Sequence, residues 1–127
     1  MKIQRFEDLQ AWQQARVLAN MVYEATGQGR FVKDYTLRDQ ICGAAGSVMH
    51  NCAEGFDSGF DSDFAVFLKY ARRSASEVQS EIYLALDRKY IDEPTFKQIY
   101  DKATETKKII NALIAYLRKS TPPKKKL

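Results

Sequence analysis

The chain has 127 residues, of which 45% are hydrophobic and 28% are charged. This composition favours one folded domain with its own core and excludes a largely disordered chain. No apolar run approaches the ~18 residues that a membrane helix needs. The first eight residues also lack the apolar stretch of a secretory signal, so we expect a cytoplasmic protein that does not enter a membrane.

The formal net charge of +4 is concentrated at the C-terminal end of the chain. Five of the 20 basic residues lie within residues 118–127, where there is no acidic residue, so residues 1–117 carry a net charge of −1. We predict that residues 1–119 form the folded domain and residues 120–127 a flexible basic tail. Such a tail either attracts RNA through salt-sensitive phosphate contacts or only keeps the chain soluble.

The first predicted helix spans residues 8–26. Its apolar residues recur at intervals of three and four, which places them on one face of a helix. This face consists of Trp12, Ala15, Ala19, Val22 and Thr26. The segment Gly27-Gln-Gly29 is expected to end the helix, because glycine readily adopts the left-handed conformation that closes helices.

The second predicted helix spans residues 36–54, with Thr36 as its N-terminal cap. Its apolar face consists of Leu37, Ile41, Ala44 or Ala45, Val48 and Cys52. Glycine costs a helix up to about 1 kcal/mol relative to alanine. We therefore expect a neighbouring helix to approach closely at Gly43 and Gly46 and offset that cost. The chain is expected to break from Gly55 to Gly59.

The third and fourth predicted helices span residues 62–89 and 94–119, and Asp92 is expected to cap the fourth. In both, apolar residues recur at alternating intervals of three and four residues. The third helix contributes Leu68, Ala71, Ala75, Val78, Ile82 and Ala85, and the fourth contributes Phe96, Ile99, Ala103, Thr106, Ile110, Leu113 and Leu117. Four amphipathic helices joined by short loops predict an all-α, antiparallel up-and-down four-helix bundle.

Further apolar residues flank these faces on the last two helices. They are Tyr70, Tyr83, Leu84 and Leu86 on the third, and Tyr100, Ile109, Ile114 and Tyr116 on the fourth. They either widen the core or form a second apolar surface that contacts another subunit. We favour self-association.

Residues that could support catalysis or bind a metal are few. Cys42 and Cys52 lie ten positions apart in one helix, so their backbones are about 15 Å apart and cannot be bridged by a disulfide. We expect ordinary thiols rather than a catalytic cysteine paired with His50, the one histidine. Glu54 and Glu77 lack the Glu-x-x-His pattern of di-metal bundles. The sequence therefore predicts no enzyme, no cofactor and no metal.

A polar stripe runs along one side of the second helix and contains Ser47, Asn51 and Glu54. Such side chains beside an apolar face usually form hydrogen bonds between helices and fix their register. Asn51 and Glu54 also precede Gly55, where they can satisfy backbone groups of the loop. We interpret these four residues as a structural polar motif.

Seven basic residues are candidates for contact with RNA or a protein partner, chosen by charge alone. They are Lys69, Arg72, Arg73, Lys107, Lys108, Arg118 and Lys119. The first three share one helical face, where Arg73, Glu77 and Glu81 follow at intervals of four and can form a charge ladder. A solvated surface with no partner is the alternative.

Three ordered motifs resemble a known family. They are Phe6-Glu-Asp-Leu9-Gln-Ala-Trp12-Gln-Gln-Ala15, then Leu37-x-x-Gln40-Ile41-x-x-Ala44-Ala45-x-Ser47, and Asn51-Cys-Ala-Glu-Gly55 followed by Ser62-Asp-Phe64 and Phe67-Leu68. Together they resemble the four-helix-bundle proteins encoded in intervening sequences of bacterial 23S ribosomal RNA genes. The resemblance covers residues 6–117.

This resemblance implies an up-and-down four-helix protomer that commonly forms a homopentamer with a central opening. It also implies distant kinship to accessory proteins of diversity-generating retroelements, which bind a reverse transcriptase and nucleic acid. No catalytic residues come with the family. The chain departs from the family pattern at Cys52, where an aliphatic residue is usual. It also has the acidic loop Phe56–Asp61 where a basic residue commonly follows, which argues against phosphate binding at that end.

The function that we predict is a non-enzymatic oligomeric scaffold that binds ribosomal RNA or an RNA-handling partner. The bundle, the surplus apolar surface, the basic tail and the family resemblance favour it. The alternative is a protein–protein adaptor with no role in nucleic-acid binding, which the net charge of −1 over residues 1–117 and the acidic loop favour.

Overall fold

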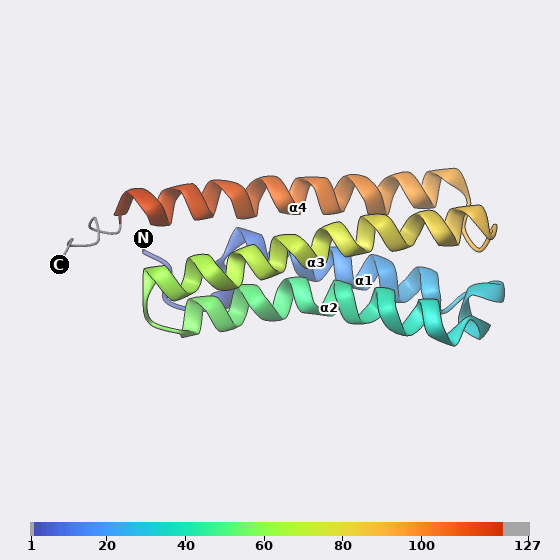
Figure 1. Ribbon diagram of the computed structural model, residues 1–127, viewed down its shortest axis with the longest axis horizontal. Helices are drawn as coiled ribbons and strands as arrows, with labels where there is room; N and C mark the ends of the chain where they lie inside the picture. The colour runs from blue at the N-terminus through green and yellow to red at the C-terminus, as the bar shows by residue number, and fades with distance from the viewer. Residues whose placement is uncertain (1, 121–127) are drawn as a thin grey trace.

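The computed structural model describes residues 2–120, which form a bundle of four long helices (Figure 1). Their bounds are α1 Gln10–Thr26, α2 Tyr35–Asp57, α3 Asp61–Asp87 and α4 Glu93–Ser120, with short 3-10 helices η1 (Phe6–Asp8) and η2 (Gly29–Lys33). Successive helices alternate in direction, and residues 2–120 contain no strand. The predicted all-α up-and-down bundle is confirmed. Most of the predicted basic tail, residues 121–127, lies outside the described residues.

The core follows the spacing of apolar residues along all four helices. Fully buried residues include Leu18, Val22, Ile41, Val48, Leu68, Val78, Ile82, Ile99 and Ile110. Ile114, which flanks the predicted apolar face, is also buried, at 3% exposure, so the buried face of α4 is wider than predicted. Leu113, which belongs to the predicted face, is only partly buried. None of the helices within residues 2–120 has the length and hydrophobicity to cross a membrane.

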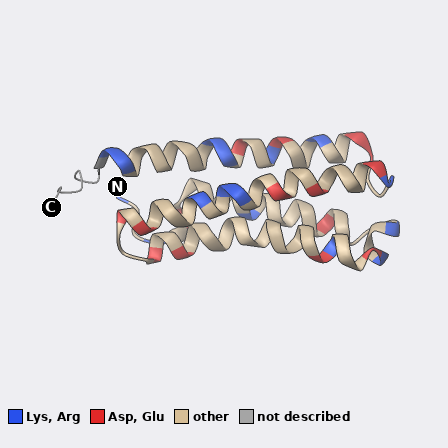
Figure 2. Cartoon of the chain, viewed as in Figure 1, with Lys and Arg blue, Asp and Glu red and all other residues tan. Residues whose placement is uncertain are grey.

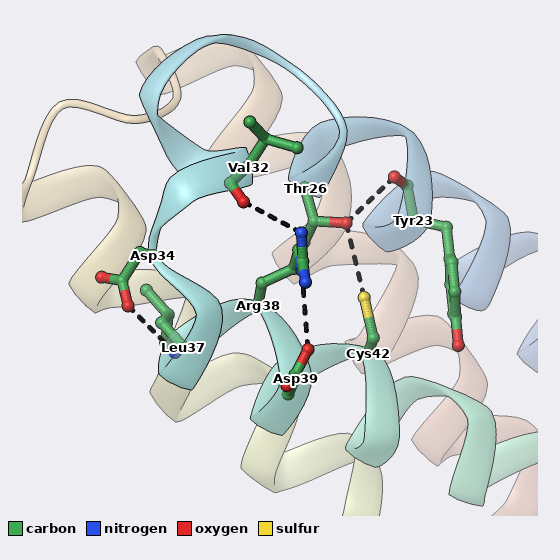
Figure 3. Close-up of polar contacts among 8 residues, drawn as sticks. All are labelled: Tyr23, Thr26, Val32, Asp34, Leu37, Arg38, Asp39 and Cys42. Carbon is green, nitrogen blue, oxygen red and sulfur yellow. Dashed lines mark hydrogen bonds and ion pairs between the residues drawn. The ribbon is translucent and has the colours of Figure 1, made fainter.

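The helix α1 ends at the predicted segment Gly27-Gln-Gly29. Gly27 has φ −86°, and it is Gly29, with φ +56°, that takes the left-handed conformation and opens η2. The Thr26 hydroxyl donates to the Tyr23 carbonyl at 3.0 Å and lies 3.4 Å from the Cys42 sulfur (Figure 3). The last turn of α1 is therefore joined to α2.

Asp34, and not the predicted Thr36, caps α2. A carboxylate oxygen of Asp34 accepts from the backbone N–H of Leu37 at 3.1 Å, so the helix begins one residue earlier than expected (Figure 3). The prediction failed because an aspartate two positions upstream supplies the acceptor that an N-terminal turn needs. Arg38 then donates to the Val32 carbonyl at 2.9 Å and fixes η2 against α2.

Gly55 does not break α2, contrary to the prediction, because the helix continues to Asp57. Its position is instead explained by close packing against α3. A Cβ at Gly55 would lie 2.8 Å from the Phe67 Cβ and 2.9 Å from the Phe64 Cδ1. The turn comes at Gly59, whose φ of +84° suits glycine.

The predicted close approach at Gly43 and Gly46 is also wrong. A Cβ at Gly43 would have no neighbour within 4 Å, and one at Gly46 would meet only the His50 side chain of the same helix, at 3.6 Å. Gly43 is exposed and Gly46 is partly buried, so neither lies where α2 meets another helix of the bundle.

The α3–α4 connection is longer than predicted, because α3 ends at Asp87 instead of residue 89. Lys89 takes a left-handed conformation, with φ 59°, and turns the chain. Asp92 Oδ1 accepts from the backbone N–H of Thr95 at 2.9 Å, which confirms the predicted cap of α4. Hydrogen bonds from the side chain and then from the backbone N–H of Thr95 hold the pKa of Asp92 below its ordinary value of 3.8.

Candidate nucleic-acid interface on α3 and α4

Basic residues gather on one half of the surface that α3 and α4 share. Residues 64–76 of α3 and residues 106–119 of α4 contain seven basic residues and no acidic residue. They are the seven candidates Lys69, Arg72, Arg73, Lys107, Lys108, Arg118 and Lys119. Because the helices are antiparallel, these two segments lie side by side (Figure 2). We call them the basic half of the α3–α4 surface.

The other half of the same surface is acidic. Residues 77–87 of α3 and 93–105 of α4 contain six acidic residues and two lysines. Both lysines lie beside a carboxylate of their own helix, Lys97 at 2.8 Å from Asp101 and Lys102 at 2.8 Å from Glu105. Along the bundle axis, the basic segments are therefore followed by mainly acidic ones, while Asp61 and Asp63 precede the basic segment at the start of α3 (Figure 2).

Two of the seven basic side chains hold α3 and α4 in register. Arg72 donates to Asn111 Oδ1 at 2.7 Å, and Lys107 donates to Gln79 Oε1 at 2.8 Å. Gln79, which is 7% exposed, donates in turn to Thr104 Oγ1 at 2.8 Å. These contacts keep the two basic segments adjacent.

The other five basic residues are exposed: Lys69, Arg73, Lys108, Arg118 and Lys119. The predicted charge ladder does not form, since within residues 2–120 Arg73 has no ion pair with Glu77. Its guanidinium lies instead over the ring of Tyr70, 5.6 Å from the ring centre. Among the described residues, none of these five basic side chains forms an ion pair with a carboxylate.

The polar motif on α2 joins α2 to α3. Ser74 donates to Ser47 Oγ at 3.0 Å, and Asn51 Nδ2 lies 2.9 Å from both Ser47 Oγ and the Ser47 carbonyl. Glu54 is exposed and takes no part in these contacts. Since Gly55 lies inside the helix, Asn51 and Glu54 do not satisfy loop groups as predicted.

Burial raises the pKa of one cysteine and of one carboxyl group, Cys52 and Glu81. Burial raises the pKa of Cys52 to about 12, so its thiol stays protonated at neutral pH and is a poor nucleophile. Burial, and then the nearby Glu77, raise the pKa of Glu81, whose Oε1 is buried without a hydrogen-bond partner. Among residues 2–120 no three metal-binding side chains of His, Cys, Asp or Glu come together.

Sequence reasoning chose the seven basic residues but missed their separation from acidic residues. The signal was present in the two acid-free segments, 64–76 and 106–119. The two acid-free segments indicate a basic surface only when antiparallel packing brings them together, because they are distant in the sequence. The buried Gln79 was also missed, because the sequence does not show that it faces Lys107 and Thr104.

The fold is similar to that of a protein of known structure and unknown function. This protein is from the S23 ribosomal protein family of Bacteroides thetaiotaomicron VPI-5482, and the TM-score is 0.75. The match covers 82% of this chain and 97% of that chain at 20% sequence identity, so it supports the fold alone. No curated protein matches this sequence. The family model of the 23S rRNA-intervening sequence proteins matches residues 7–112, and the chain belongs to this family.

Proposed function

We propose that this protein is a non-enzymatic oligomeric scaffold that binds RNA, or an RNA-handling partner, through the basic half of the α3–α4 surface. The observation that carries the proposal is the presence of seven basic residues and no acidic residue in two adjacent helix segments, 64–76 and 106–119. A surface of this kind attracts the phosphate backbone of a nucleic acid without reading its sequence.

The dimensions of the basic half suit contact with several phosphates. Residues 64–76 extend about 18 Å along α3 at the rise of an α-helix. The axes of packed helices lie about 8–10 Å apart, so the exposed basic residues of α3 and α4 form two parallel rows. Because residues 1–117 carry a net charge of −1, the attraction is localised to this surface instead of spread over the bundle.

The acidic half carries the surface that we propose for self-association. Tyr83 and Leu84 are each 48% exposed, and the Tyr83 ring lies 4.8 Å from that of Phe96 and 5.9 Å from that of Tyr100. Large exposed apolar side chains in one group favour contact with another subunit. The proposed assembly is the homopentamer that the family resemblance implies.

RNA binding is tested by fluorescence anisotropy with a labelled ribosomal RNA fragment at two salt concentrations. The double variant Lys69→Gln/Lys108→Gln removes two exposed charges of the basic half, and Lys33→Gln/Lys97→Gln removes two elsewhere. We expect the first to weaken binding and to lower the slope of log affinity against log salt by about 0.7–0.9 per lost phosphate contact. No binding of the wild-type protein at low salt, or equal losses in both variants, contradicts the proposal.

Self-association is tested by sedimentation velocity at micromolar concentration. We expect an oligomer, and we expect Leu84→Gln to shift the distribution towards smaller species. The matched variant Val17→Gln changes an apolar residue that is 42% exposed on α1 and should leave the distribution unchanged. A wild-type protein that is strictly monomeric would rule out the scaffold.

A second function is favoured by the α2–α3 turn. Phe60 is 69% exposed beside Asp61, and both line a pocket of about 260 Å³ with Phe56 and Tyr116. An aromatic and acidic surface of this kind suits a basic protein segment, so the chain would act as a protein–protein adaptor. A pull-down partner that survives nuclease treatment and is lost in Phe60→Ser supports the adaptor; loss of the partner on nuclease treatment excludes it.

A further inference from the structure

An exposed aromatic ring lies within the basic half, at Tyr70 of α3. Its side chain is 43% exposed, and its hydroxyl forms no hydrogen bond within residues 2–120. Polar contacts therefore do not explain the orientation of the ring. Tyr70 follows Lys69 directly and lies one helical turn before Arg73.

Two neighbours on the same helix hold the Tyr70 ring. The Arg73 guanidinium lies over the ring, 5.6 Å from its centre, and the Phe67 ring meets it nearly perpendicularly, with centres 6.2 Å apart. Such contacts restrict the side chain before any ligand binds, so less entropy is lost on binding. The result is a fixed aromatic and guanidinium platform beside exposed cations.

A platform of this type distinguishes single-stranded from double-stranded RNA. Bases in a duplex are stacked on one another and present only their edges, whereas unpaired bases can stack on tyrosine or on a guanidinium. The neighbouring cations can then hold the phosphates on either side of that base. Phosphate contacts alone would not prefer one form of RNA.

We propose that the basic half binds single-stranded RNA, with one unpaired base stacked on the Tyr70–Arg73 platform. This inference rests on the proposed function and names the form of RNA that the same surface binds. Tyr70 supplies the stacking surface, and the adjacent Lys69 supplies a phosphate contact. Duplex RNA is held by the phosphate contacts alone and binds more weakly.

The experiment compares a single-stranded oligouridine with a duplex of equal length, by anisotropy at one salt concentration. We expect Tyr70→Leu to weaken single-strand binding at least about fivefold, the lower end of the contribution of one stacked base, and to leave duplex binding unchanged. Tyr70→Phe keeps the ring and should bind as the wild type does. Tyr23→Leu, at a 58% exposed tyrosine of α1, is the matched control.

The salt dependence separates this inference from the proposed function. Tyr70→Leu removes no charge, so the slope of log affinity against log salt should stay at the wild-type value, whereas Lys69→Gln/Lys108→Gln should lower it. If the wild type binds both RNAs and Tyr70→Leu weakens neither or both equally, the stacking inference is wrong and the proposed function stands. If the wild type binds neither RNA, both are wrong.

Discussion

The substitution Gly55→Ala tests the closest approach between α2 and α3. The new Cβ would lie 2.8 Å from the Phe67 Cβ, 2.9 Å from the Phe64 Cδ1 and 3.3 Å from the Phe64 carbonyl oxygen. The first and third of these atoms are fixed to the α3 backbone and cannot rotate away. The helices must therefore separate locally to accept one methyl group.

The expected loss of stability follows from two opposing terms. Overpacking a well-filled core costs about 1–3 kcal/mol, and replacing glycine by alanine inside a helix returns up to about 1 kcal/mol. With the full gain, we expect Gly55→Ala to lower the free energy of unfolding by up to about 2 kcal/mol. The same substitution at Gly43, where the Cβ meets nothing within 4 Å, should raise it by about 0.5–1 kcal/mol.

Urea denaturation of wild type and both variants at one protein concentration measures the difference, because the stability of an oligomer depends on concentration. The pair of variants controls for the chemistry, since each adds one methyl group to α2. Opposite signs at Gly55 and Gly43 support the packing argument. If Gly55→Ala is as stabilising as Gly43→Ala, the α2–α3 contact is not as close as the structure shows.

Three further changes test individual polar side chains. Ser74→Ala removes the hydrogen bond to Ser47 and should lower the unfolding free energy by about 0.5–1.5 kcal/mol, measured by urea denaturation. Glu81→Gln should stabilise the protein at neutral pH, because the raised pKa shows that the ionised form is disfavoured on folding. Its advantage in melting temperature should vanish below pH 4.5, where the wild-type carboxyl is protonated in both states. Asp92→Asn should make the melting temperature depend less on pH below pH 3.8, because the lowered pKa makes wild-type stability fall as Asp92 is protonated. An unchanged dependence of melting temperature on pH would show that the carboxylate cap contributes nothing to stability there.

The candidate surface was predictable in its residues but not in its arrangement. Charge alone selected Lys69 and Lys108, yet the sequence does not show that their segments are adjacent. Arg72 and Lys107 were grouped with them, although their side chains hold Asn111 and Gln79 across the α3–α4 contact. Which cations are free and which hold the helices together depends on side-chain directions that only the packed helices define.

By itself the sequence determined the number of helices, their order and most of their buried faces. Apolar spacing of three and four is a local property, and it places residues such as Ile82 and Ile110 in the core whatever the partner helix is. Tertiary structure decided the roles of the glycines and of the surface charges. Gly43 and Gly55 are both glycines of α2, but only Gly55 contacts α3. Which side of α2 faces α3 is set by the packing of all four helices.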